Sequence, residues 1–381
     1  MEPTALIDNS NSDSGPKHEN LARRQATSKG LNDDAGDRDW DSEEEESDSD
    51  DVYDSDLDED PNPASASHQR KMRKSKSKAK GSFERMLLNC IVNTDCIAPH
   101  YQDIFISKSI IDSLEQVTTL ALLRKNAFDH GVLKDNKVTG AVLYGPPGTG
   151  KSLLAKGMAK QSGFAMISVS TAELWQKRHG DDEKMIKALF SLARKLHPSI
   201  VFIDEADAML GTRNAGEKRH IRAMLNQFLM EWDGLMTGPN SPFILLATNR
   251  PFDLDPAVLR RAPVQIHLDV PTTHERHGIL NLLLEHETLV GIDTKQLASL
   301  TPGYTGSDLK NLCVTAATQC VSEQLRAGHE DSPVRALTLQ HFRAALEKVK
   351  ATNLPKTMTN QMKTFGQSAT HEEATAHGGS V

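Results

Sequence analysis

The 381-residue sequence has few cysteines, no long hydrophobic run and no excess of positive charge. Its 4 cysteines are too few for a disulfide scaffold, and their spacing matches no metal site, which favours a reducing compartment. The apolar runs are far shorter than the roughly 20 residues of a membrane-spanning helix, so no intrinsic membrane span is predicted. The acidic, polar N-terminus excludes a secretory signal and an arginine-rich transit peptide. These absences predict a soluble intracellular protein.

The formal net charge of −8 is unevenly distributed along the chain. Residues 1–60 carry 21 acidic and 5 basic side chains, whereas residues 61–80 carry 7 basic side chains and no acidic one. Residues 81–381 are nearly neutral and hold most of the apolar residues. This excludes both a uniformly basic nucleic-acid binder and a wholly disordered chain. We predict that residues 1–82 form a disordered tail, first acidic and then basic.

The role of this tail is open to several interpretations. The acidic part is either a solvated segment that maintains solubility or a docking segment for a basic partner. The basic run at 68–80 is either a nuclear import signal, a contact for nucleic acid or an anionic surface, or a counter-charge to the acidic block. Nucleic acid is therefore not excluded as a partner of residues 68–80.

From about residue 83 the sequence predicts ordered structure. Apolar residues at helical spacing predict a helix over residues 110–128. Five β-rich runs follow at residues 138–144, 166–170, 199–203, 243–247 and 264–270. Helical stretches separate most of these runs. Strands that alternate with helices indicate an α/β fold with a parallel sheet.

The β-rich runs stop near residue 272, and the remaining pattern predicts a small C-terminal helical domain. Its expected helices are residues 273–286, 306–325 and 338–350. Cys313 and Cys320 lie seven residues apart in the second of these helices, so we expect them to pack in its core. The polar residues 351–381 are expected to fray as a C-terminal tail.

A glycine-rich motif follows the first predicted strand and consists of Gly145, Pro146, Pro147, Gly148, Thr149, Gly150, Lys151 and Ser152. Its pattern is that of a phosphate-binding loop (P-loop), and it opens a predicted helix, which is the context such a loop requires. Glycines let backbone N–H groups surround an anion, and the helix N-terminus adds partial positive charge. Lys151 is expected to reach the β- and γ-phosphates of a bound nucleotide, and Ser152 to ligate Mg²⁺.

Two adjacent carboxylates, Asp204 and Glu205, follow the predicted strand at 199–203. Ligands of parallel α/β sheets bind at the carboxyl ends of the strands, so we expect both carboxylates beside the P-loop. Asp204 suits the coordination shell of Mg²⁺, and Glu205 suits the polarisation of an attacking water. The sequence therefore predicts a P-loop NTPase fold that binds a nucleoside triphosphate and Mg²⁺.

The sequence from about residue 100 to 350 resembles a single AAA-type ATPase module, which implies that the nucleotide is ATP. The resemblance is carried by the P-loop, by the run Phe202–Asp207 and by segments that follow later strands. Ala247–Arg250 resembles the first sensor of that family, which implies that Asn249 orients water against the γ-phosphate. Gly303–Leu309 resembles the start of the small-domain helix that closes over adenine.

The segment Leu254–Arg261 resembles the part of the AAA module that carries its arginine fingers. The resemblance implies that Arg260 and Arg261 act in trans, on ATP bound to a neighbouring subunit. It also implies a ring, a homo-hexamer, whose subunits have a large α/β subdomain (83–271) and a small helical subdomain (272–350).

Glu231–Leu235 looks like the dislocases of the mitochondrial outer membrane and their fungal relatives, and resembles the microtubule severers less closely. Three features depart from the dislocase pattern. No N-terminal membrane helix is predicted, and the first pore loop (Lys177–Gly180) has Arg178 where the family has an aromatic residue. Trp175, three residues earlier, is expected to pack inside the fold. The adenine-side segment Asp103–Ser107 lacks the usual pair of glycines.

We therefore predict an ATP-hydrolysing AAA ATPase that assembles as a ring and remodels, extracts or unfolds a protein substrate of unknown identity. The expected catalytic residues are Glu205, Asn249, Arg260 and Arg261, and the expected metal ligands are Ser152 and Asp204. Three alternatives stay open: an ATP-dependent assembly scaffold, a chromatin or nucleic-acid factor, and an ATPase similar to the microtubule severers. The expected location is the cytoplasm or an association with mitochondria, with the nucleus as an alternative.

Overall fold

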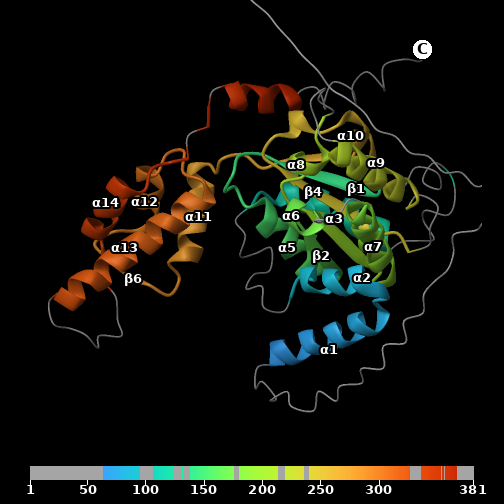
Figure 1. The fold of residues 1–381 in the computed structure, drawn as a ribbon. Coiled ribbons are helices and arrows are strands. Elements are labelled where there is room, and N and C mark those ends of the chain that lie inside the picture. The colour runs from blue at the N-terminus through green and yellow to red at the C-terminus, as the bar shows by residue number, and fades with distance from the viewer. Residues whose placement is uncertain are drawn as a thin grey trace, which may run out of the picture. The chain divides into compact units, whose positions relative to one another are not determined.

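The computed structural model describes residues 63–94, 106–123, 131, 138–175, 180–212, 219–235, 240–326, 336–352, 354–355 and 357–366. Five of its strands form one parallel sheet: β1 (Gly140–Tyr144), β2 (Ala165–Val169), β3 (Ser199–Ile203), β4 (Phe243–Thr248) and β5 (Val264–His267). The strand order is β2-β3-β4-β1-β5, so β1 lies between β4 and β5. Figure 1 labels β1 next to β4 in this sheet. The predicted α/β fold with a parallel sheet is confirmed.

Helices cover both faces of this sheet, which explains why β1, β3 and β4 are buried along their whole length and mostly apolar. They are α3 (Lys108–Leu123), α5 (Lys151–Ser162), α6 (Thr171–Leu174), α7 (Asp181–Lys195), α8 (Asp207–Leu210), α9 (Arg219–Asp233) and α10 (Pro256–Arg261), with a 3-10 turn η4 (Pro251–Asp253). Val142 of β1 belongs to a core cluster that includes residues of α7 and α9. Leu143, the next residue, belongs to a second cluster that includes residues of α3 and α5. The sheet is therefore the central layer of three.

The segment Glu231–Leu235, at the end of α9, is used to support the sheet. The indole Nε1 of Trp232 donates to Thr139 Oγ1 at 2.9 Å, directly before β1. A Cβ atom on Gly140 would lie 2.4 Å from the Trp232 ring, so only glycine allows this close approach. Trp232 thereby fixes the strand that leads into the P-loop.

The small domain follows β5 and has its own core. Its elements are α11 (Thr273–Leu283), β6 (Thr288–Val290), α12 (Thr294–Leu300), α13 (Gly306–Arg326), β7 (Ala336–Thr338) and α14 (Leu339–Lys348). Cys313 and Cys320 of α13 are buried in this core, as expected. The predicted small helical domain is confirmed, but it also contains a short parallel pair of strands, β6 and β7, which the sequence did not indicate. Each strand has three residues, too few to leave an apolar run in the sequence.

The expectation of a disordered tail through residue 82 was wrong for its last part. Helix α1 (Pro63–Lys78) and helix α2 (Gly81–Leu87) occupy this region, and the turn η1 (Leu88–Cys90) follows. High charge does not prevent folding here, because the charged side chains of α1 are exposed while Met72 and Ala79 pack against the first core cluster. The acidic residues before α1 lie outside the described residues.

The expectation that residues 351–381 fray was also wrong for part of that range. Residues 357–366 form a helix, and Met362 on it is only 3% exposed. Phe365 packs edge-on against Tyr144 of the sheet, with ring centroids 5.2 Å apart. Two apolar residues three apart were enough to anchor this helix in an otherwise polar stretch. Among the described residues no helix is both long enough and apolar enough to span a membrane.

Candidate functional site

The P-loop connects β1 to α5 at the carboxyl end of the sheet. Gly150, at the N-cap of α5, has φ +98°, a left-handed conformation that favours glycine. Lys151 begins the helix, and its Nζ donates to Gly145 O at 3.0 Å and to Pro146 O at 2.7 Å. The lysine thus folds back over the loop, and the N-terminus of α5 supplies N–H groups that suit an anion.

Lys151 is buried, which changes its acidity. The residue is 7% exposed, and burial lowers the pKa of its amino group to about 8, although Asp204 and Asp207 act in the opposite direction. An anion held in the loop favours the charged ammonium and would raise this pKa again. Phosphate binding near pH 8 is therefore linked to proton uptake at Lys151.

Ser152 and Asp204 meet from two different elements. Ser152 lies in the first turn of α5 and Asp204 directly follows β3, and Ser152 Oγ donates to Asp204 Oδ2 at 2.5 Å. A hydroxyl and a carboxylate beside a phosphate-binding loop are oxygen ligands that suit Mg²⁺. Within the described part of the chain, no cluster of three or more His, Cys, Asp and Glu side chains could hold a metal ion. A cation here would draw its remaining ligands from phosphate and water, as Mg²⁺ usually does.

Glu205 and Asn249 follow neighbouring strands and line the same cavity. Glu205 is exposed at φ +51°, a left-handed conformation uncommon outside glycine, and its N–H donates to Asp204 Oδ1 at 3.0 Å. Thr248 Oγ1 donates to Asp207 Oδ1 at 2.5 Å, which joins the ends of β3 and β4. Asn249 Oδ1 is buried and, within the described residues, accepts no hydrogen bond. An unsatisfied buried acceptor is costly, so this atom favours an additional donor such as water.

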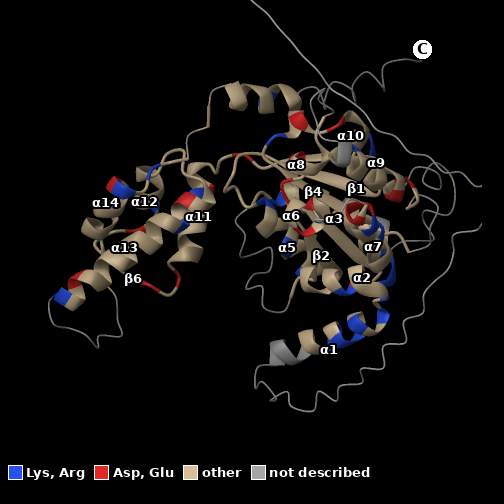
Figure 2. Ribbon diagram, in the orientation of Figure 1, with Lys and Arg blue, Asp and Glu red and all other residues tan. Residues whose placement is uncertain are grey.

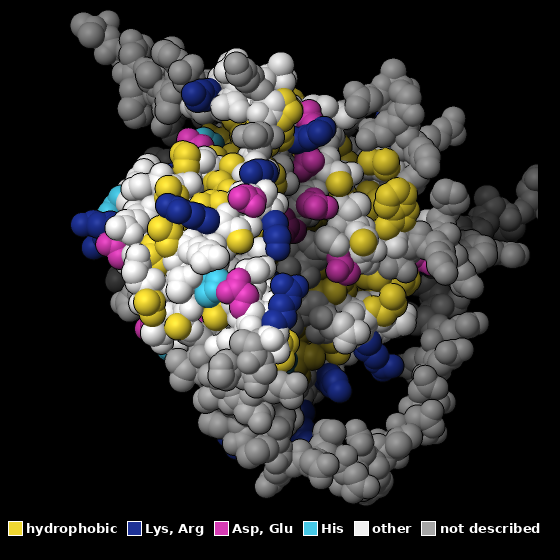
Figure 3. Space-filling view, turned by 90° about the vertical axis from the view of Figure 1, so that its left-hand side faces the viewer, with side chains coloured by type: hydrophobic (Ala, Val, Ile, Leu, Met, Phe, Trp, Pro, Cys, Tyr) yellow, Lys and Arg dark blue, Asp and Glu magenta, His cyan; other side chains and the backbone are white. Residues whose placement is uncertain are grey.

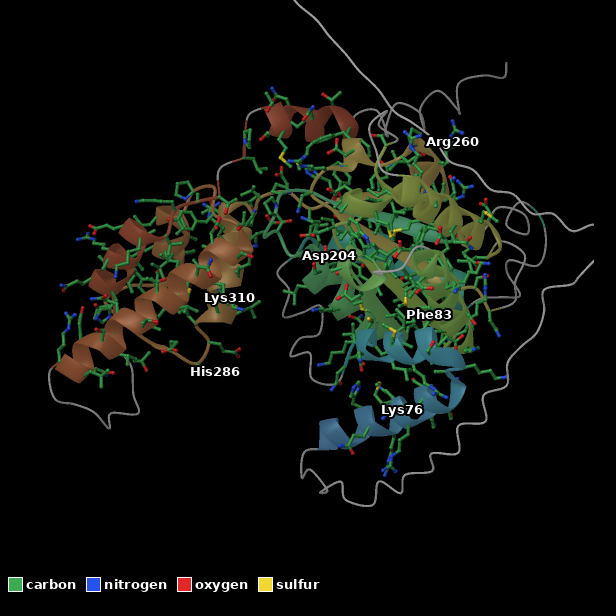
Figure 4. All side chains as sticks on the ribbon, viewed as in Figure 1. Lys76, Phe83, Asp204, Arg260, His286 and Lys310 are labelled. Atoms are coloured by element: carbon green, nitrogen blue, oxygen red, sulfur yellow. The ribbon has the colours of Figure 1, made fainter. Side chains whose placement is uncertain are left out.

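These side chains line one cavity of about 510 Å³, a volume that suits a nucleotide. The large domain lines it with Ile106, Pro147–Leu153, Asp204, Glu205 and Asn249. The small domain lines it with Ile279, Leu282, Leu283, Gly306, Ser307 and Lys310. Figure 4 labels Asp204 beside the sheet and Lys310 on α13. Sequence motifs did not predict the cavity-lining residues of the small domain, except near Gly306, because these residues belong to no recognisable motif.

The small domain also contacts the P-loop directly. The N–H of Ser307 donates to Gly148 O at 3.1 Å. A Cβ atom on Gly148 would lie 2.8 Å from Thr305 Oγ1, so glycine is needed for the close approach as well as for its φ of +78°. The predicted segment Gly303–Leu309 is therefore brought to the cavity. Of the predicted adenine-side segment Asp103–Ser107, Ile106 lines the cavity, and residues 103–105 lie outside the described residues.

Arg260 and Arg261 are not brought to this cavity. Both lie at the end of α10, and Figure 4 shows Arg260 well apart from Asp204. Arg261 Nε and Nη2 donate to the two carboxylate oxygens of Asp233, at 2.6 and 2.7 Å. This hydrogen-bonded pair raises the pKa of Arg261 and lowers the pKa of Asp233. Arg260 is exposed, so the two adjacent arginines have different surroundings.

The expectation that Trp175 packs inside the fold was wrong, because its side chain is 48% exposed. Its neighbour Leu174 is fully buried and anchors the short helix α6, and the Trp175 N–H donates to Thr171 O at 3.0 Å where that helix ends. Because the Leu174 side chain points into the core, the side chain of the next residue, Trp175, points toward solvent. The predicted pore loop Lys177–Gly180, with Arg178, lies outside the described residues apart from its last glycine.

Comparison with known proteins identifies two matching regions and several relatives. Residues 141–271 match the ATPase family associated with various cellular activities (AAA), and residues 291–334 match the AAA+ lid domain. The outer mitochondrial transmembrane helix translocase of Danio rerio is 38% identical over 257 residues, which cover 66% of this chain and 70% of that protein. The Xenopus tropicalis protein of the same name is 37% identical over 267 residues, covering 68% and 73%. Spastin of Danio rerio is 36% identical over 287 residues, covering 73% of this chain and 49% of spastin. Because this similarity extends through both the sheet domain and the lid, the chain belongs to the AAA family and is an ATP-hydrolysing enzyme.

Proposed function

We propose that the cavity between the sheet and the small domain is the ATP site, and that ATP hydrolysis drives a ring of this chain to remodel protein substrates. The supporting observation is that five polar side chains line one cavity: Lys151, Ser152, Asp204, Glu205 and Asn249. The set combines a cation for phosphate, ligands for Mg²⁺ and a carboxylate base. Such a set supports turnover, whereas a nucleotide-binding scaffold needs no base.

The role proposed for each group follows from its position. Lys151 exchanges its two loop carbonyls for the β- and γ-phosphates, while loop and helix N–H groups bind other phosphate oxygens. Ser152 and Asp204 hold Mg²⁺, which when bound neutralises charge on the phosphates. Glu205 accepts a proton from the attacking water. Asn249, whose Oδ1 is an unsatisfied acceptor among the described residues, orients that water.

The proposal of a ring, a homo-hexamer, is supported by two features outside the cavity. Arg260 is exposed and remote from the ATP site of its own chain, which suits an arginine that acts on a neighbour's ATP. On α13, Val314 and Leu325 are 56% and 54% exposed, and Leu283 on α11 is 36% exposed. Figure 3 faces the small domain and shows hydrophobic side chains between charged ones. Exposed apolar side chains on one domain face favour burial against a second copy.

The names of the relatives support the proposed substrate class and location. The relatives are named translocases of transmembrane helices at the outer mitochondrial membrane. We infer that this chain acts on membrane proteins with a transmembrane helix and associates with mitochondria, and their names give no support for the nuclear alternative. Trp232 and Asp233 of the Glu231–Leu235 segment have structural contacts, so this segment does not discriminate between a membrane-protein substrate and a microtubule substrate. We retain residues 83–271 and 272–350 as the proposed large and small subdomains.

The test compares the full-length wild-type chain with Glu205→Gln. The amide keeps the side-chain shape but cannot accept a proton, so ATP binding should stay within a few-fold of wild type. Hydrolysis should fall by about 10²-fold or more. The ATP-bound variant should accumulate as a ring and retain its protein substrate.

ATPase assays of the wild-type enzyme with three candidate substrates distinguish the proposed function from the severing and nucleic-acid alternatives. ATPase activity should rise with a membrane protein in detergent and stay constant with microtubules or DNA. Stimulation by microtubules or DNA alone would contradict the proposed substrate class. Wild-type turnover in Glu205→Gln would instead contradict the catalytic assignment.

A further inference from the structure

Helix α1 presents basic side chains over most of the outward surface of its described part, residues 68–78. It contains no Asp or Glu, and six of its residues are exposed and basic: Arg70, Lys71, Arg73, Lys74, Lys76 and Lys78. Figure 2 shows this helix in blue along much of its described length, with no red on it. At 100° per residue, the six side chains spread over more than half of the helix circumference. We call this surface the basic face of α1.

The opposite side of α1 attaches the helix to the large domain. Met72 and Ala79 pack against the first core cluster, and Ser75 is buried with its hydroxyl bonded to a carbonyl one turn earlier, at 2.9 Å. At the end of α1, Lys78 Nζ donates to Lys195 O at 3.0 Å, where α7 ends. The basic face is therefore part of the folded domain, and its charges keep a defined spacing.

The chemistry of the basic face selects an anionic partner. Arg73, Lys74 and Lys76 have no ion-pair partner among the described residues. Met72, the one large apolar residue in the sequence of α1, packs against the core, and the helix contains no Phe, Tyr or Trp to insert into a bilayer or to stack on bases. Recognition must therefore act through charge alone, on an array of negative groups.

We propose that the basic face of α1 binds the anionic headgroups of a phospholipid membrane. A lipid layer is flat and its headgroups are mobile, so they can gather along a convex helix that is fixed on a domain. Proteins that bind single-stranded nucleic acid usually stack its bases on aromatic side chains, and α1 has no Phe, Tyr or Trp for this purpose. The choice of lipid also rests on the proposed membrane-protein substrate. Each Lys or Arg near an anionic bilayer strengthens binding by about fivefold, and salt screens this attraction.

The experiment measures co-sedimentation of the full-length chain with vesicles of phosphatidylcholine alone or with about 30% phosphatidylserine, without nucleotide. The test variant removes four charges from the basic face: Arg70→Gln, Arg73→Gln, Lys74→Gln and Lys76→Gln. The matched control removes four exposed charges elsewhere: Lys295→Gln, Lys348→Gln, Lys350→Gln and Lys363→Gln. The test variant should lose about 10²–10³-fold in binding to phosphatidylserine vesicles, whereas the control should change by a few-fold. Basal ATPase activity shows that both variants are folded.

Ser77 allows a second variant that keeps every basic side chain. Its hydroxyl is exposed between Lys76 and Lys78 and donates to Lys74 O at 2.9 Å. Ser77→Glu places a negative charge within the basic face and should weaken vesicle binding by about fivefold or more. Ser77→Ala removes the hydrogen bond without adding charge and should bind as the wild type does.

Several results would overturn the proposal. They are absence of binding to the phosphatidylserine vesicles, equal binding by the test variant, and an equal loss in the matched control. Duplex DNA or RNA that binds more tightly than the vesicles, in a parallel titration, would assign the face to nucleic acid instead. Because vesicle binding is measured without ATP or protein substrate, it can succeed where the proposed substrate class fails, and the two failures are distinguishable.

Discussion

Nucleotide binding by this chain should weaken steeply as the pH rises above about 8, because Lys151 then loses its proton. Burial lowers its pKa from 10.5 to about 8. At pH 9 about one tenth of Lys151 would carry a proton, whereas a lysine of pKa 10.5 would remain almost fully protonated. Phosphate needs the charged form, so the apparent affinity should fall by up to about tenfold per pH unit. The phosphates of the nucleotide ionise near pH 6, so their charge stays constant between pH 7.5 and 9.5.

The assay is calorimetric titration of ADP between pH 7.5 and 9.5, in buffers that differ in their heat of ionisation. At pH 8 the difference between buffers should report uptake of about half a proton per nucleotide bound. Lys151→Arg is the control, because its guanidinium stays charged throughout. It should bind more weakly at every pH but without a pH dependence. A constant affinity of the wild type from pH 7.5 to 9.5, or no proton uptake at pH 8, would refute this reasoning.

The same burial has a consequence for stability. The folded-state pKa of Lys151 lies below its unfolded value, so the unfolded chain binds more protons between about pH 8 and 10.5. The contribution of Lys151 to the free energy of unfolding therefore rises with pH between about pH 8 and 10.5. Below about pH 8 the buried charge of Lys151 destabilises the folded state by up to about 3 kcal/mol. Lys151→Met should thus stabilise the nucleotide-free chain at pH 7 while abolishing nucleotide binding. A lower melting temperature for Lys151→Met would show that the loop carbonyls compensate for burial.

Two further predictions concern packing and the arginines. Leu87→Ala should cost about 2–5 kcal/mol in chemical denaturation, since Leu87 of α2 is 1% exposed, whereas Met86→Ala, at 50% exposed, should cost less than about 1 kcal/mol. Equal costs would contradict the packing of α2 on the large domain. Arg260→Ala should lower ATP hydrolysis by about 10³-fold with little change in ATP affinity. Arg261→Ala should lower both hydrolysis and stability, and Asp233→Asn should reproduce only its loss of stability, because the two residues form an ion pair. Wild-type hydrolysis by Arg260→Ala would remove it from the shared-site proposal.

The central sheet and the P-loop could be predicted because their residues are constrained locally. Strands buried on both faces leave continuous apolar runs, and a phosphate loop needs glycine at fixed positions. The order of the strands could not be predicted in this way. It places β1 between β4 and β5, which both come much later in the chain, and depends on packing between segments that a local pattern does not contain.

The errors have a common physical cause, since a few apolar contacts decided the structure where the average composition was polar. Met72 and Ala79 anchor α1, and Met362 and Phe365 anchor the helix at 357–366. Charge counts over windows of residues hide such pairs. Trp175 is the opposite case, because its large aromatic side chain predicts burial but is 48% exposed. The neighbouring Leu174 is the buried residue at this position of the chain.

The small domain and the helix that follows it contact the sheet domain at two points, one within the phosphate loop and one directly before it. The start of α13 meets Gly148 through a backbone hydrogen bond, and the helix at 357–366, which follows α14, places Phe365 against Tyr144 immediately before the loop. A movement of the small domain would therefore act on the phosphate loop through two contacts, at Gly148 and at Tyr144. Rotation about one of these contacts would disturb the other.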